Sequence, residues 1–260
     1  VGFFVKRASK GTDEYFAAGR SMPWWLLGTS MVATTFSTDT PNLITNLIRE
    51  KGVSCNWVWW AFLLTGMMTV FFYARLWRRS KVLTDLEFYE IRYAGRSAAL
   101  VRGFRALYLG LFFNCVILAT VTLSAAKIAN ILFGWSRLET VLFGSIAAIA
   151  FTVLSGLWGV VVTDLVQFAM AMTGAVAAAY YAVQQEAVGG LSGLVAKIPP
   201  STLSLMPDFG NRDLVMTVLI IPLTVQWWSV WYPGAEPGGG SYVAQRMLAA
   251  KNEKHSMMAT

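Results

Sequence analysis

The chain has 260 residues, of which 56% are hydrophobic and only 13% are charged, about half the charged fraction of an ordinary soluble domain. This composition excludes a soluble globular domain and indicates an all-α polytopic membrane protein. The net charge of +7 does not indicate a nucleic-acid partner, because the basic residues cluster between apolar segments. The two cysteines and one histidine favour neither an enzyme nor a metal site.

Six apolar segments are long enough to cross a bilayer as a helix, which takes about 20 residues. They are residues 23–48, 56–77, 103–133, 138–156, 159–183 and 213–244. The sequence therefore predicts a multi-pass integral protein of the cell (inner) membrane, with the lipid bilayer as a partner.

The basic residues orient these segments. One side collects 15 Lys and Arg, within residues 6–20, 75–105 and 246–254, whereas the other side has 5. Because cytoplasmic loops carry the excess of Lys and Arg, the first side is predicted to be cytoplasmic and the 184–212 loop external. Residues 83–93 are expected to form a short amphipathic helix on the inner surface.

Both ends of the sequence resemble cut helices. The first residues, Val-Gly-Phe-Phe-Val, are expected to be the tail of a helix that begins upstream, and residues 254–260 the first turn of another. We expect the chain to be a fragment.

A polar stretch interrupts the first apolar segment at residues 33–42, Ala-Thr-Thr-Phe-Ser-Thr-Asp-Thr-Pro-Asn. Pro41 has no N–H, so the carbonyl of Ser37 loses its helical partner. A broken helix that presents carbonyls beside hydroxyls suits a small cation and a substrate, which makes Ser37, Asp39 and Thr40 candidate substrate ligands. A simple proline kink is the alternative, although a kink does not require an aspartate in mid-membrane.

A second irregular stretch, residues 227–240, lies in the last segment. Two prolines and four glycines fall within its final eight residues, which excludes a regular helix. Trp228 and Trp231 are candidates for stacking on an organic ligand, and Glu236 for pairing with a cation. Alternatively, the helix ends near Trp231 and the rest is a cytoplasmic loop.

A third candidate is Asp164, within Thr-Asp-Leu-Val-Gln at 163–167. Asp164 and Gln167 share a helix face because they are three residues apart. The residue is suited to an ion site, but its place near a helix N-terminus explains it equally well.

Several landmarks recur in a familiar order. They are Asp-Glu-Tyr-Phe-Ala-Ala-Gly-Arg at 13–20, Pro-Trp-Trp at 23–25, Ser-Met-Val-Ala at 30–33, the run from Ser155 to Gln167, and Tyr-Val-Ala-Gln-Arg-Met-Leu-Ala-Ala-Lys at 242–251. Together they resemble the sodium/solute symporter family, which includes carriers of glucose, proline, pantothenate and sialic acid. The resemblance covers nearly the whole chain.

The resemblance implies part of a LeuT-type inverted-repeat fold, with an extra helix before the core. Residues 1–260 would form one transmembrane domain, truncated at both ends. The first repeat would span about 21–183, the outer loop 184–212, and the start of the second repeat 213–260.

The resemblance also implies ligands. One sodium ion would be held by the carbonyls of Ala33 and Phe36, and Asp164 would line the inner sodium exit or a second sodium site. Sugar carriers place a glutamate where Asn56 stands and a glutamine where Thr40 aligns. Asn56 thus remains a candidate substrate residue, but a sugar is disfavoured, and an amino acid, another carboxylate and a polyol stay open.

The expected function is sodium-coupled symport of a small organic solute by alternating access. Two alternatives remain at this point: a proton-coupled transporter of the same fold, with Asp39, Asp164 or Glu236 as carrier, and a transporter-like sensor fused to a signalling module. The oligomeric state is left open.

Overall fold

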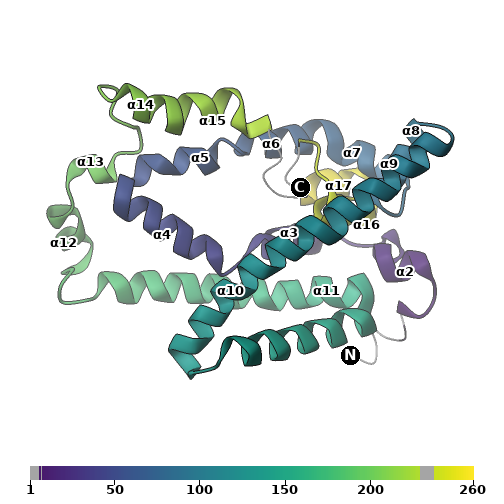
Figure 1. Ribbon diagram of the computed structural model, residues 1–260, viewed down its shortest axis with the longest axis horizontal. Helices are drawn as coiled ribbons and strands as arrows, with labels where there is room; N and C mark the ends of the chain where they lie inside the picture. The colour runs from purple at the N-terminus through teal and green to yellow at the C-terminus, as the bar shows by residue number, and fades with distance from the viewer. Residues whose placement is uncertain (1–5, 7, 229–236) are drawn as a thin grey trace.

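The computed structural model describes residues 6, 8–228 and 237–260, which are almost entirely helical (Figure 1). Short 3-10 and π segments join several of the helices. The helices are α2 (Thr12–Ala17), α3 (Trp24–Thr35), α4 (Asp39–Lys51), α5 (Trp57–Trp60), α6 (Leu63–Met68), α7 (Ala74–Ser80), α8 (Phe88–Arg92), α9 (Arg96–Leu107), α10 (Asn114–Phe133), α11 (Arg137–Val183), α12 (Gly190–Lys197), α13 (Pro200–Leu203), α14 (Arg212–Val215), α15 (Ile221–Thr224), α16 (Ser241–Ala249) and α17 (Glu253–Ala259).

Among the described residues, three helical stretches are long and apolar enough to cross a membrane. They are Val53–Ser80, Arg96–Phe133 and Arg137–Val183. The first two contain the predicted segments 56–77 and 103–133. The short helix α8 lies within the predicted amphipathic segment 83–93 and packs against α9.

The third stretch, α11, is two helices joined at Gly156. This residue has φ 57° and ψ −166°, a combination that residues with a Cβ essentially never adopt. The chain reverses there, so the two legs of α11 run side by side in opposite directions (Figure 1). The two legs correspond to the predicted segments 138–156 and 159–183.

The first predicted segment is broken, as the polar stretch suggested. Helix α3 ends at Thr35, Phe36 has an extended conformation, and α4 begins at Asp39. Pro41 lies in the first turn of α4, where a backbone N–H has no helical partner in any case. The proline therefore starts the second helix and does not merely kink a continuous one.

The structure corrects the last predicted segment, 213–244, which is not one continuous helix. The helix that begins at Arg212 ends at Thr224, and α16 is a separate helix that starts at Ser241. Pro222 removes one bond from the helical ladder, and the preceding residues 216–220 form a π turn, a common way for a helix to absorb an irregularity. The helix therefore stops well before the predicted boundary.

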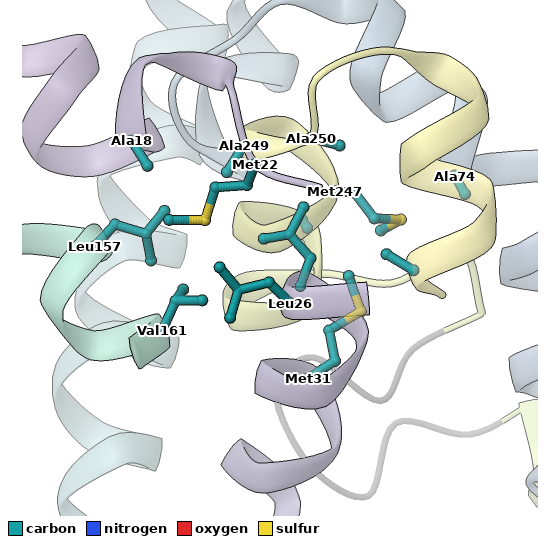
Figure 2. Packing of buried hydrophobic residues seen from close by; sticks show 13 residues of the cluster. Ala18, Met22, Leu26, Met31, Ala74, Leu157, Val161, Met247, Ala249 and Ala250 are labelled. Carbon is teal, nitrogen blue, oxygen red and sulfur yellow. The ribbon is translucent and has the colours of Figure 1, made fainter. Parts of the chain in front are cut away.

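The core joins the beginning and the end of the chain (Figure 2). The N–H of Met22 donates to the carbonyl of Ala249 at 3.2 Å, and the Met22 carbonyl accepts from Lys251 at 3.0 Å. This pairing holds α16 and α17 against α3 and α7. Buried members of the cluster include Met22, Leu26, Leu27, Met31, Leu157, Val161 and Met247.

Candidate functional site

The helix break lies at the two predicted sodium-binding carbonyls, those of Ala33 and Phe36. Ala33 is buried, and its carbonyl accepts the N–H of Phe36 at 3.1 Å. The Phe36 ring stacks on Phe168 of α11, with 5.9 Å between ring centres and 11° between planes. The break is thus fixed on one side by the second leg of α11.

Three of the polar side chains at the break have hydrogen-bond partners. Thr38 donates to the carbonyl of Val121 in α10 at 3.1 Å, and the hydroxyls of Ser37 and Thr40 lie 3.0 Å apart. Asp39 differs, since its Oδ1 atom is buried and has no hydrogen-bond partner among the described residues. A buried carboxylate oxygen normally has a donor, so this atom has unused capacity to accept a hydrogen bond or to bind a cation.

Asp164, in the second leg of α11, lies in a second polar cluster that also includes residues of α3. Its Oδ2 atom accepts the hydroxyl of Ser30 at 2.5 Å and the Nη2 of Arg246 at 3.2 Å. The exposed fractions of the three residues are 7% for Asp164, 0% for Ser30 and 4% for Arg246. We call these residues, together with Thr34, the Arg246 cluster.

Arg246 uses several donors in this cluster. Its Nε donates to the Ser30 hydroxyl at 3.1 Å, its Nη2 to the Thr34 hydroxyl at 3.0 Å, and its Nη1 to the Tyr242 carbonyl at 3.3 Å. One guanidinium therefore joins α3, the second leg of α11 and α16. A buried ion pair is tolerated when such extra hydrogen bonds satisfy the remaining donors.

The Arg246 cluster lies close to the break. Ser30 and Ala33 are three residues apart on α3, which corresponds to about 4.5 Å along the helix axis. With the predicted orientation, in which α3 rises from the cytoplasm, the cluster lies about one turn to the cytoplasmic side of the Ala33 carbonyl.

The other predicted substrate residues are not all brought to the break. Trp228 is 54% exposed and lies in the 3-10 turn Gln226–Trp228, and Trp231 and Glu236 fall outside the described residues. Asn56 is buried and bonds to the Val53 carbonyl at 2.9 Å, in a turn that follows the opposite end of α4. Because α4 has 13 residues, it is about 20 Å long, so Asn56 is remote from Asp39.

The second irregular stretch is held on both of its described sides by the helical stretch Val53–Ser80. Thr65 donates to the carbonyl of Trp227 at 2.5 Å, and Thr69 accepts the N–H of Gly238 at 3.1 Å. Trp77 donates to the Gly238 carbonyl at 2.7 Å. Both threonines are buried, and Thr69 begins the π segment Thr69–Tyr73, a feature common at functional sites.

Sequence reasoning missed Ser30, Arg246, Thr65 and Thr69. In the sequence Arg246 serves as an orienting charge of a cytoplasmic loop and as part of the 242–251 landmark, but not as a site residue. The local signal is limited to the apolar residues Met247, Leu248 and Ala249 that follow Arg246 directly, because a charge beside residues that become buried requires a partner. Ser30 and the threonines carry no comparable signal in the sequence.

Comparisons with known proteins identify the family of this chain. Residues 15–260 match the sodium:solute symporter family. A sodium/glucose cotransporter of Vibrio parahaemolyticus is 25% identical over 97% of this chain and 47% of its own length. The sodium/glucose cotransporter 2 of Rattus norvegicus is 27% identical over 96% and 39%, and the sodium/sialic acid symporter SiaT of Proteus mirabilis is 27% identical over 68% and 34%.

A solved structure described as the substrate-bound outward-open state of a sodium-coupled sialic acid symporter has a TM-score of 0.71 to this chain at 21% identity. It is matched over 98% of this chain and 52% of the other, which supports the partial LeuT-type fold. The chain thus spans between about a third and a half of the length of these relatives. Since the family match extends over nearly every described element, including the break and the Arg246 cluster, the chain belongs to the sodium:solute symporter family and is part of an integral membrane protein.

Proposed function

We propose that the full-length protein carries out sodium-coupled symport of a small organic solute by alternating access, in the cell (inner) membrane. The observation that carries the proposal is the break at residues 36–38, with a buried unpartnered oxygen of Asp39 beside it. The family match and the sodium-coupled relatives support it.

Sodium would bind at the carbonyls of Ala33 and Phe36, together with ligands from the rest of the protein. Leaving inward, the ion would pass Asp164, about one turn away on the cytoplasmic side. The guanidinium of Arg246 is already paired with the Asp164 carboxylate. The sodium ion and the guanidinium therefore compete for Asp164, so inward release of the ion is coupled to a displacement of α16.

The solute would bind between the break and the second irregular stretch. Ser37, Asp39 and Thr40 would contact it from one side, and Trp228, Trp231 and Glu236 from the other. The unpartnered Asp39 oxygen favours a solute with a hydrogen-bond donor, an amino group or a hydroxyl, as in an amino acid or a polyol.

The test is uptake of radiolabelled amino acids, polyols, sugars and carboxylates by the full-length protein in proteoliposomes, with and without an inward sodium gradient. We expect sodium-dependent accumulation of one class. Asp39→Asn is expected to raise the half-saturating solute concentration about tenfold, because a charge-assisted hydrogen bond is lost. Asp208→Asn, in the outer loop, serves as the control and leaves it unchanged.

Uptake that follows a pH gradient and ignores sodium would replace this proposal with the proton-coupled one. The absence of uptake for every class, in a protein that still binds a solute, would favour a sensor.

A further inference from the structure

A cavity of about 1000 Å³ lies on the side that the basic residues assign to the cytoplasm. It is bounded by α7, α8 and α9 and by residues 237–240, and we call it the inner groove. These elements gather at one end of the molecule (Figure 1), away from the break between α3 and α4. The inner groove borders the end of the second irregular stretch, but its lining includes none of the described residues that are proposed to hold sodium or solute.

The inner groove is lined by three arginines, Arg79, Arg92 and Arg105, and by one carboxylate, Asp85. Arg79 is paired with Glu253 at 2.9 Å, and Asp85 accepts the N–H of Ser241 at 2.9 Å. Arg92 and Arg105 make no ion pair within the described part of the chain. Outside the Arg79–Glu253 pair, the lining therefore holds two arginines against the single carboxylate of Asp85, whose hydrogen-bond partner is a neutral N–H, so it carries an excess of positive charge.

Both of these arginines lie against aromatic rings. The guanidinium carbon of Arg105 is 5.0 Å from the centre of the Tyr89 ring, and that of Arg92 is 5.7 Å from the Tyr93 ring. The Nε of Arg105 is buried and has no hydrogen-bond partner among the described residues. A buried donor of this kind indicates an absent acceptor.

The remaining wall is apolar. Phe88 is 42% exposed, Ile91 63% and Tyr108 44%, and all three face the cavity. A small inorganic anion would leave this surface uncovered, whereas an amphiphile with an anionic head would use both the charges and the apolar wall. Basic pockets between helices at the cytoplasmic surface suit anionic phospholipid headgroups.

We propose that the inner groove binds one anionic phospholipid of the cytoplasmic leaflet. The phosphate accepts hydrogen bonds from Arg92 and Arg105, and the acyl chains lie along the exposed apolar side chains of α8 and α9.

The test is native mass spectrometry of the full-length protein, purified from bilayers of phosphatidylglycerol or of phosphatidylcholine. We expect one retained phosphatidylglycerol and little phosphatidylcholine. Arg92→Gln and Arg105→Gln are each expected to reduce the retained fraction about fivefold, while Arg96→Gln, an exposed arginine outside the groove, changes it less than about twofold.

A second measurement does not depend on removing charge. A photoreactive benzoylphenylalanine at Tyr93 should crosslink phosphatidylglycerol in the folded protein. The proposal would be overturned by equal retention of both lipids or by absence of the crosslink. It would also be overturned if inorganic phosphate binds and displaces no lipid, because the site would then belong to a free anion.

Discussion

The guanidinium of Arg246 lies 3.2 Å from the carboxylate of Asp164, although 82 residues separate them in the chain. The side chains are 5% and 10% exposed, so each charge has been almost fully removed from water. Such a pair is stable only as a pair, because a single buried charge has neither solvent nor a counter-ion.

Replacing Arg246 with alanine is therefore expected to destabilise the protein by about 3–5 kcal/mol, because Asp164 is left buried and uncompensated. The double variant Asp164→Ala with Arg246→Ala should lose less than the sum of the single variants. Unfolding of the full-length protein in detergent measures both. Strict additivity would show that the two charges do not interact.

The turn at Gly156 tolerates no side chain. Its φ of 57° with ψ of −166° suits only glycine, and an added Cβ would lie 3.0 Å from the Tyr15 carbonyl. We expect Gly156→Ala to cost about 1–3 kcal/mol in unfolding free energy.

Gly144→Ala is the matched control for this turn. It lies in the first leg of α11 with open space around the new methyl group, and alanine is favoured over glycine in a helix by about 1 kcal/mol. A Gly156→Ala variant as stable as Gly144→Ala would contradict the observed turn.

Thr69 is predicted to position the second irregular stretch. Thr69→Val keeps the shape but leaves the Gly238 N–H without its acceptor, at a cost of about 1–3 kcal/mol. We expect weaker solute binding in uptake assays with an unchanged sodium requirement, and recovery in Thr69→Ser. Thr120→Val is the control, because the Thr120 hydroxyl bonds only within its own helix. An equal loss in both variants would assign Thr69 no positioning role.

The pair Arg79–Glu253 should give a pH-dependent contribution to stability. The hydrogen bond from Arg79 lowers the pKa of the exposed Glu253 carboxyl below its ordinary value. The contribution is therefore present above the pKa of the unfolded chain, about 4.3, and is lost as pH falls through the lower folded pKa. Glu253→Gln should thus be less stable than the natural protein at pH 7 but equal to it at strongly acidic pH, and a difference that persists there would exclude this origin.

The break in the first segment could be predicted from local chemistry. Pro41 and the polar residues around Asp39 indicate an interrupted helix whatever the rest of the chain does. The two legs of α11 were likewise visible as two apolar runs around Gly156. Such features depend on residues that are neighbours in sequence.

The Arg246 cluster and the end of the last helix could not be predicted in this way. The apolar run after Arg212 continues to Trp231, so its length predicts a longer helix, and Pro222 is a local signal of an interruption but does not fix the end at Thr224. The partners of Arg246 lie on α3 and α11, and no periodicity in residues 241–249 identifies them. These features depend on contacts between distant parts of the chain.

The distance in sequence between Ser30 and Arg246 has a consequence for biosynthesis. The two residues are 216 positions apart, and ribosomes add about 5–20 residues per second, so Arg246 follows Ser30 by roughly 10–40 s. During that interval Asp164 arrives first and finds the Ser30 hydroxyl but no guanidinium. Asp164 is thus synthesised 82 residues before the arginine that pairs with it, so α3 and α11 are complete before this cluster can form.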